Sequence, residues 1–202
     1  MTALSSDPDP ATGTRADLAA RPVGARSIVM VGMMGAGKTA VGRRLAARLG
    51  WHFVDADQAI EEAAGLPIEE IFARHGEPHF RSGERNVIAR LLAEGPMVLA
   101  TGGGAFMDPD TRARIAASGL SVWLRADVET LVRRTGRRTD RPLLKAGDRR
   151  ETIARLVAQR YPVYAGADIV VDTDDGPPEE TVERVLAALA GHGIPPARET
   201  PR

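Results

Sequence analysis

The sequence predicts an α/β protein, with one three-layer α/β/α domain built around a five-stranded parallel sheet. Five short apolar runs, each of a length suited to a buried strand, alternate with stretches whose apolar residues recur at helical spacing. Strands that are separated by helices pair in parallel, because each connection must cross the sheet. The runs are 28–31, 51–54, 97–100, 120–124 and 168–171.

The composition narrows the class of protein. Lysine plus arginine and aspartate plus glutamate each number 27, so there is no basic excess for nucleic acid or an anionic membrane. Cysteine is absent, which excludes disulfides and cysteine zinc sites. No apolar run approaches the roughly 18 residues that span a bilayer, and the first residues lack the pattern of a signal peptide. We therefore expect no nucleic-acid partner, no membrane association and a cytoplasmic location.

Both ends of the chain differ in composition from the middle. Residues 1–25 are rich in serine, aspartate, proline and alanine and poor in large apolar groups, which predicts a disordered N-terminal tail. Residues 191–202 predict a flexible C-terminal tail. The folded domain is therefore expected over residues 26–190.

The first apolar run leads into a glycine-rich turn that fills the phosphate-loop pattern G-x-x-x-x-G-K-[ST]. Gly32, Gly37, Lys38 and Thr39 are its fixed positions. Backbone N–H groups of such a loop point at phosphate oxygens, the lysine reaches the β- and γ-phosphates, and the hydroxyl ligates Mg²⁺. A glycine turn with an incidental lysine is the alternative, but a helix predicted over 38–49 follows as the motif requires. The candidate nucleotide-binding residues here are Gly35, Ala36, Gly37, Lys38, Thr39 and Ala40.

Two carboxylates follow the second predicted strand. Asp55 and Asp57 lie at its carboxyl end, the edge at which parallel sheets bind ligands. One carboxylate is suited to Mg²⁺ and its waters, and the other to a phosphoryl acceptor. The alternative is a helix N-cap with a solvated neighbour, because helical residues follow directly.

A second glycine turn, Gly102 to Gly104, follows the strand predicted over 97–100. Three consecutive glycines let a backbone approach a ligand closely, although a simple tight turn explains them too. Helices are predicted from Pro67, around 87–92, and from Asp108-Pro109. The residues 76–84 lie between the first two of these helices.

The last third of the chain contains an arginine-rich segment, residues 133–150. It follows a helix that Asp127 is predicted to cap. Such a run is commonly a solvated face, but its glycines and proline also suit a mobile flap over a polyanion. A helix over 151–160, the fifth strand and a closing helix over 179–190 complete the domain.

Several sites, taken in order, resemble one family. The sequence resembles the shikimate kinases, which are P-loop kinases of the nucleoside-monophosphate-kinase type. The resemblance covers Gly-Met-Met-Gly-Ala-Gly-Lys-Thr, Phe-Val-Asp-Ala-Asp, Phe-Arg-Ser-Gly-Glu, Thr-Gly-Gly-Gly-Ala, Thr-Asp-Arg-Pro-Leu-Leu and Arg-Tyr-Pro-Val-Tyr. It implies a P-loop kinase fold with a lid at about 133–150.

The resemblance also implies roles for individual residues. Asp57 contacts the attacking hydroxyl of shikimate, and Asp55 helps hold magnesium through water, together with Thr39. Arg81 and Arg160 grip the substrate carboxylate, for which a guanidinium fork is suited. Glu84 orients Arg81, and Gly102, Gly103 and Gly104 line the acceptor site. Arg134 stacks near adenine, Arg141 meets the transferring phosphoryl charge, and Thr101 stands where many P-loop enzymes have an aspartate.

The expected activity is therefore transfer of the γ-phosphate of ATP to the 3-hydroxyl of shikimate by a monomer that uses Mg²⁺. Lys38, Asp57 and Arg141 are the expected catalytic residues, and Asp57 serves as base or as an orienting group. Two alternatives stay open on the residues alone. A related small-molecule kinase, such as a gluconate kinase, would share the phosphate loop, and a nucleotide switch would hydrolyse ATP without an acceptor.

Overall fold

A computed structural model of the protein describes residues 26–136 and 148–192. The predicted N-terminal tail lies outside the described residues, as do residues 193–202 of the predicted C-terminal tail. So do Arg141 and most of the predicted lid.

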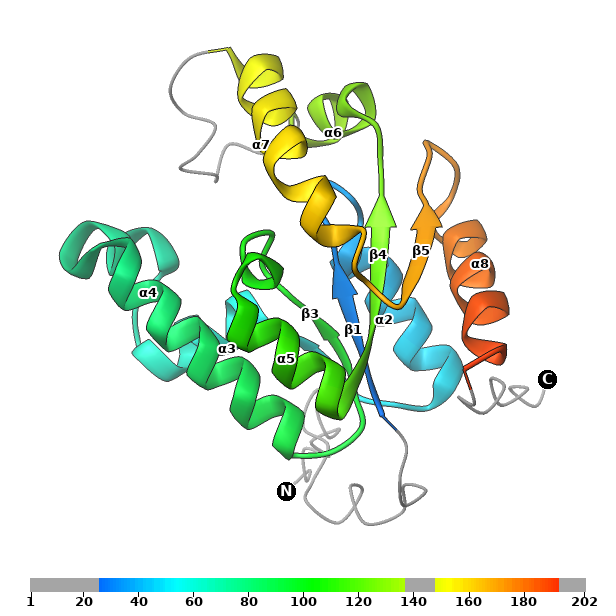
Figure 1. Ribbon diagram of the computed structural model, residues 1–202, viewed down its shortest axis with the longest axis horizontal. Helices are drawn as coiled ribbons and strands as arrows, with labels where there is room; N and C mark the ends of the chain where they lie inside the picture. The colour runs from blue at the N-terminus through cyan, green and yellow to red at the C-terminus, as the bar shows by residue number, and fades with distance from the viewer. Residues whose placement is uncertain (1–25, 137–147, 193–202) are drawn as a thin grey trace, which may run out of the picture.

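Five parallel strands form one sheet in the order β2-β3-β1-β4-β5 (Figure 1). Register partners include Ile28 with Val98 and with Leu120. The predicted sheet is thus confirmed, with shifts of one or two residues at the strand ends. The strands are β1 (Ser27–Val31), β2 (Phe53–Asp55), β3 (Val98–Ala100), β4 (Gly119–Arg125) and β5 (Ile169–Asp172).

Helices cover both faces of this sheet, which confirms the three-layer arrangement. Figure 1 shows α5 in front of the sheet beside α4, with α2 and α8 together behind it. The helices are α2 (Lys38–Leu49), α3 (Ala56–Ala64), α4 (Ile68–Ala93), α5 (Pro109–Ser118), α6 (Val128–Thr135), α7 (Arg149–Tyr164) and α8 (Pro178–Ala190), with a 3₁₀ turn η1 (Ala105–Met107). None of the helices in the described ranges is both long enough and apolar enough to cross a membrane.

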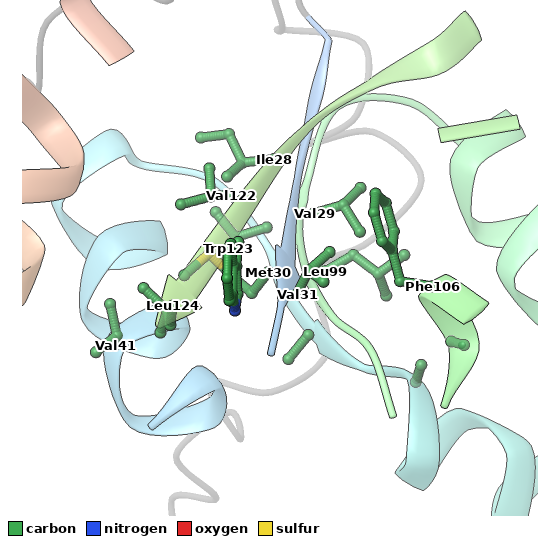
Figure 2. Packing of buried hydrophobic residues seen from close by; sticks show 14 of the residues in the cluster. Ile28, Val29, Met30, Val31, Val41, Leu99, Phe106, Val122, Trp123 and Leu124 are labelled. Carbon is green, nitrogen blue, oxygen red and sulfur yellow. The ribbon is translucent and has the colours of Figure 1, made fainter. Parts of the chain in front are cut away.

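The core lies on both sides of the central strand. All five residues of β1 are buried, as expected for a strand that has a neighbour on each edge and a helix on each face. Figure 2 shows Val29 and Phe106 on one side of β1, with Ile28 and Val41 on the other. The edge strand β5 instead alternates buried and exposed residues.

Helix α4 differs from the prediction. The stretch 76–84 was expected to separate two helices, but within it only Gly76 has non-helical angles, with φ of 79°, and the residues after it are helical. Pro78 is tolerated because it lies in the first turn after this break, where its missing N–H has no helical partner. Arg81 and Glu84 therefore lie one turn apart on a helix.

Candidate active site

The candidate site lies at the carboxyl edge of the sheet. The chain leaves β1 toward β2 on one side and returns to β4 on the other, so the strand order reverses at the end of β1. A crevice at such a reversal is the usual ligand site of open parallel sheets. The phosphate loop follows β1 directly, and the segments after the other four strands surround it (Figure 1).

The phosphate loop is tightly packed against the sheet. A Cβ on Gly32 would lie 2.7 Å from the carbonyl oxygen of Leu124, so no side chain fits at this position. Lys38 Nζ donates to the carbonyl oxygens of Gly32 and Met33 at 2.8 and 2.9 Å. These bonds hold the ammonium group over the loop, at the N-terminus of α2, where an anion is favoured.

The side chain of Asp55 fits both interpretations given above, as a helix N-cap and as a carboxylate beside the phosphate loop. Its Oδ1 accepts from the backbone N–H of Asp57 at 3.1 Å, which makes it the N-cap of α3. Its Oδ2 accepts from the Thr39 hydroxyl at 2.9 Å. Capping by one oxygen therefore leaves the other oxygen facing the phosphate loop.

A cleft of about 540 Å³ adjoins the loop on the β5 side. Ala36, Gly37, Arg134, Thr173, Gly176 and Pro178 are among the residues that line it. Arg134 Nη1 donates to the carbonyl of Gly35 and to the Thr173 hydroxyl, both at 3.3 Å. Its guanidinium is thus fixed beside the loop, where a flat base could stack on it.

The three glycines after β3 each face a different side chain that the sequence predicts for the site. A Cβ on Gly102 would lie 2.7 Å from Asp57 Oδ1, one on Gly103 would lie 3.1 Å from Arg160 Nη1, and one on Gly104 would lie 2.6 Å from Arg81 Nη1. Any larger residue in this turn would displace these groups. The glycines therefore bring together one carboxylate and two guanidiniums from α3, α4 and α7.

Two acidic side chains of α4, Glu84 and Glu77, hold the guanidinium of Arg81 in place. Arg81 Nη1 donates to Glu84 Oε2 at 2.7 Å, and Glu77 accepts from the same guanidinium at 3.1 Å. Glu84 is 2% exposed, and this burial raises the pKa of its carboxyl group, against the effect of the Arg81 charge. Its other oxygen, Oε1, is buried without a hydrogen-bond partner among the described residues.

Arg160 is the second guanidinium at the turn and is 9% exposed. Its Nη1 donates to the carbonyl oxygen of Gly103 at 2.9 Å. The hydroxyl of Tyr164, one turn further along α7, donates to the same oxygen. Two donors from one helix thus hold this carbonyl.

Comparisons with known proteins agree on one family. The sequence model described as shikimate kinase matches residues 34–190. The shikimate kinase of Paramagnetospirillum magneticum is 62% identical over 164 residues, which are 81% of this chain and 84% of that protein. The chain belongs to the shikimate kinase family.

Solved structures support the same assignment. A shikimate kinase from Acinetobacter baumannii in complex with shikimate has a TM-score of 0.80 and 36% identity, over 84% of this chain and 96% of that one. A gluconokinase from Sinorhizobium meliloti has a TM-score of 0.55 at 20% identity, over 83% and 93% of the two chains, and so shares the fold alone. The resemblance to the shikimate kinase family is thus confirmed, together with the ATP-dependent kinase class.

The predicted site residues of this shikimate kinase family member come together at one edge, apart from Arg141, which lies outside the described residues. Thr101 is buried at the end of β3, and its hydroxyl donates to the carbonyl of Met30 at 3.0 Å. This bond joins the ends of β3 and β1.

Two parts of the site were missed from the sequence. The segment after β5, including Thr173 and Pro178, lines the cleft, and its place after the last strand of a parallel sheet could have indicated this. Tyr164 is the last residue of the Arg-Tyr-Pro-Val-Tyr motif, in which the resemblance implied a role for Arg160 alone. No spacing rule connects a tyrosine of α7 with a carbonyl 61 residues earlier.

Proposed function

We propose that this chain transfers the γ-phosphoryl group of ATP to the 3-hydroxyl of shikimate, giving shikimate 3-phosphate and ADP. The observation that carries the proposal is the glycine turn 102–104, at which Asp57, Arg81 and Arg160 face three successive residues. A carboxylate with two guanidiniums suits an acceptor that has both a hydroxyl group and a carboxylate. Family membership supports the same substrate.

The acceptor carboxylate would lie between Arg81 and Arg160. Guanidinium groups bind carboxylates through paired charge-assisted hydrogen bonds. The side chains of Arg81 and Arg160 are both already partly buried. Glu84 and Glu77 hold Arg81 in place before the acceptor arrives, which lowers the ordering cost of binding. The unpartnered Oε1 of Glu84, 3.0 Å from the Cβ position of Gly102, would accept from an acceptor hydroxyl.

Phosphoryl transfer would take place between Lys38 and Asp57. Lys38 would exchange its bonds to the Gly32 and Met33 carbonyls for phosphate oxygens and stabilise the charge that develops on the transferring group. Asp57 would orient the attacking hydroxyl and receive its proton. Arg141 remains a prediction of the resemblance for the same transition state.

The oxygen atoms near the phosphate loop fit a magnesium ion. Thr39 Oγ1 and Asp55 Oδ2 lie 2.9 Å apart, and Mg²⁺ binds through one or two such ligands together with water and phosphate oxygens. Within residues 26–136 and 148–192, no three histidine, cysteine or acidic side chains form a complete protein cage for a metal. When bound, the ion would neutralise charge on the β- and γ-phosphates, and the chain would hold it with Thr39 directly and Asp55 through water.

The test is ADP release measured by a coupled assay with ATP and magnesium. Release should depend on shikimate, and gluconate at the same concentration should not replace it. A rate that is the same with and without shikimate would contradict the proposal and favour a nucleotide switch. Stimulation by gluconate alone would favour the related sugar-acid kinases.

We propose a cytoplasmic location and a monomeric working state. The monomer is supported by the fact that one chain supplies both sides of the site, from the cleft beside β5 to the turn after β3. Light scattering at the enzyme concentration of the assay would test the monomer, and a dimer would refute this part of the proposal.

A further inference from the structure

Tyr164 is a buried polar group that the proposed reaction does not use. Its side chain is 0% exposed, and its ring packs edge-on against Phe106 and Trp123. The ring is therefore fixed, and its hydroxyl can point in only one direction. That direction leads to the carbonyl oxygen of Gly103, in the middle of the acceptor turn.

The hydroxyl is a permanent donor. Burial raises the pKa of Tyr164 to about 12, although the nearby positive charge of Arg160 acts in the opposite direction. Tyr164 therefore keeps its proton throughout the range in which enzymes are assayed. A carbonyl oxygen has two lone pairs, so the Gly103 oxygen accepts from Tyr164 and from Arg160 Nη1 together.

These two donors have different tasks when an acceptor binds. On the proposed function, Arg160 turns its guanidinium toward the acceptor carboxylate, and the Nη1–H group that now donates to Gly103 would shift to that carboxylate. Without the Tyr164 hydroxyl, the Gly103 carbonyl would then have no hydrogen-bond donor when the acceptor is bound. An unsatisfied carbonyl that is partly buried raises the free energy of that bound state. With Tyr164 present, the Gly103 oxygen retains one donor and Arg160 can move without this penalty.

We propose that Tyr164 is a positioning residue for the acceptor site, which keeps the Gly103 carbonyl hydrogen-bonded so that Arg160 is released to bind the acceptor carboxylate. Tyr164 touches neither substrate. Its effect is therefore on acceptor affinity, and it acts through Arg160.

The test compares Tyr164→Phe with Tyr161→Phe. Both remove one hydroxyl from α7, and the Tyr161 hydroxyl donates to the carbonyl of Ala126 instead of the acceptor turn. We expect the KM for shikimate of Tyr164→Phe to rise roughly tenfold, the loss of about one hydrogen bond. Its KM for ATP should change little, and Tyr161→Phe should resemble the wild type in both constants.

Coupling with Arg160 separates positioning from a general loss of packing. In an Arg160→Ala background no guanidinium has to leave Gly103, so adding Tyr164→Phe should raise the shikimate KM by less than twofold. A full tenfold rise in that background would overturn the proposal. So would equal effects on the two KM values, or a Tyr161→Phe variant as impaired as Tyr164→Phe.

A tyrosine that carries several ring fluorines at position 164 gives an independent measurement if the phenylalanine variant fails to fold, because one fluorine would not bring a pKa of about 12 into the assay range. It keeps the ring, but its hydroxyl is more acidic and stops donating at lower pH. The shikimate KM should then rise with pH in this variant and not when the same residue replaces Tyr161, and matching pH profiles would refute the role. Wild-type enzyme that shikimate does not stimulate would instead contradict the proposed function itself.

Discussion

The hydroxyl of Thr39 donates to Oδ2 of Asp55 at 2.9 Å and so connects the first turn of α2 with the end of β2. Asp55 Oδ1 meanwhile caps α3. One carboxylate thus has a structural and a proposed metal-binding oxygen, and substitutions can separate the two.

Asp55→Asn should raise the magnesium concentration needed for half-maximal activity by roughly tenfold or more, because the charge beside the ion is lost. The asparagine oxygen still caps α3, so the melting temperature should stay close to that of the wild type. Asp55→Ala is the control and should lower both metal response and stability. A magnesium titration of Asp55→Asn that superimposes on the wild type would contradict the assignment.

Lys38→Met should reduce kcat by roughly a thousandfold or more, because a charge aimed at the transferring group contributes several kcal/mol to the barrier. The side chain of Lys38 is bonded to two loop carbonyls, so circular dichroism and the melting temperature must be measured alongside. A folded variant with the kcat of the wild type would refute this role.

Arg81→Ala and Arg160→Ala should each raise the shikimate KM by tens of times, since a charge-assisted hydrogen bond contributes roughly 1.5 to 3 kcal/mol. ATP affinity, measured by calorimetry without shikimate, should change little. Arg74→Ala, which removes an exposed ion pair with Glu70 on the same helix, is the control. Variants that lose ATP binding and still bind shikimate would assign these arginines to the nucleotide side.

Gly104→Ala should weaken shikimate binding without unfolding the protein. The added methyl group would lie 2.6 Å from Arg81 Nη1, and a guanidinium at the end of a flexible side chain can move away. Gly83→Ala is the control, because nothing lies within 4 Å of its Cβ position. It should leave KM unchanged and, as an alanine within helix α4, stabilise the protein by about 0.5 to 1 kcal/mol. Equal KM values in the two variants would contradict the prediction.

The carboxylate of Asp127 should make the stability of the folded protein depend on pH in the acidic range. The Thr130 backbone N–H donates to its carboxylate at 2.7 Å and lowers the pKa of Asp127 below its ordinary value. A lowered pKa in the folded state stabilises the protein above the unfolded pKa, about 3.9, and this contribution is lost as the pH falls through the folded pKa.

Urea denaturation of Asp127→Ala and the wild type tests this dependence. The variant should be less stable by about 1 kcal/mol at neutral pH, and the difference should narrow below about pH 4. Asp127→Asn keeps a capping oxygen and should lose only the pH-dependent part. A difference that is constant with pH would show that the charge contributes nothing.

The sheet was predictable because each strand is a short apolar run bounded by turn residues. The order β2-β3-β1-β4-β5 was not predicted, since periodicity states which residues are buried but not which strands are neighbours. The helical turn that contains Arg81 and Glu84 was not predicted, because Gly76 and Pro78 precede it and such residues usually interrupt helices.

The phosphate loop and the Asp55–Asp57 pair could be read from the sequence because each is local. The bond between Tyr164 and Gly103 joins residues 61 positions apart, and the Thr173 hydroxyl meets Arg134 across 39 positions. Such contacts depend on the packing of α7 and β5 against the sheet. No pattern within either segment specifies them.

The position of β1 in the centre of the sheet has a consequence for how specificity can be changed. Segments after β2 and β3 form the proposed acceptor side, and segments after β4 and β5 form the proposed nucleotide side, so the phosphoryl group would cross at the tip of β1. Of the acceptor groups discussed, only those of α7 come from beyond β4. Substitutions within residues 55–104 and α7 should therefore change acceptor preference, while the proposed base-binding residues are left as they are.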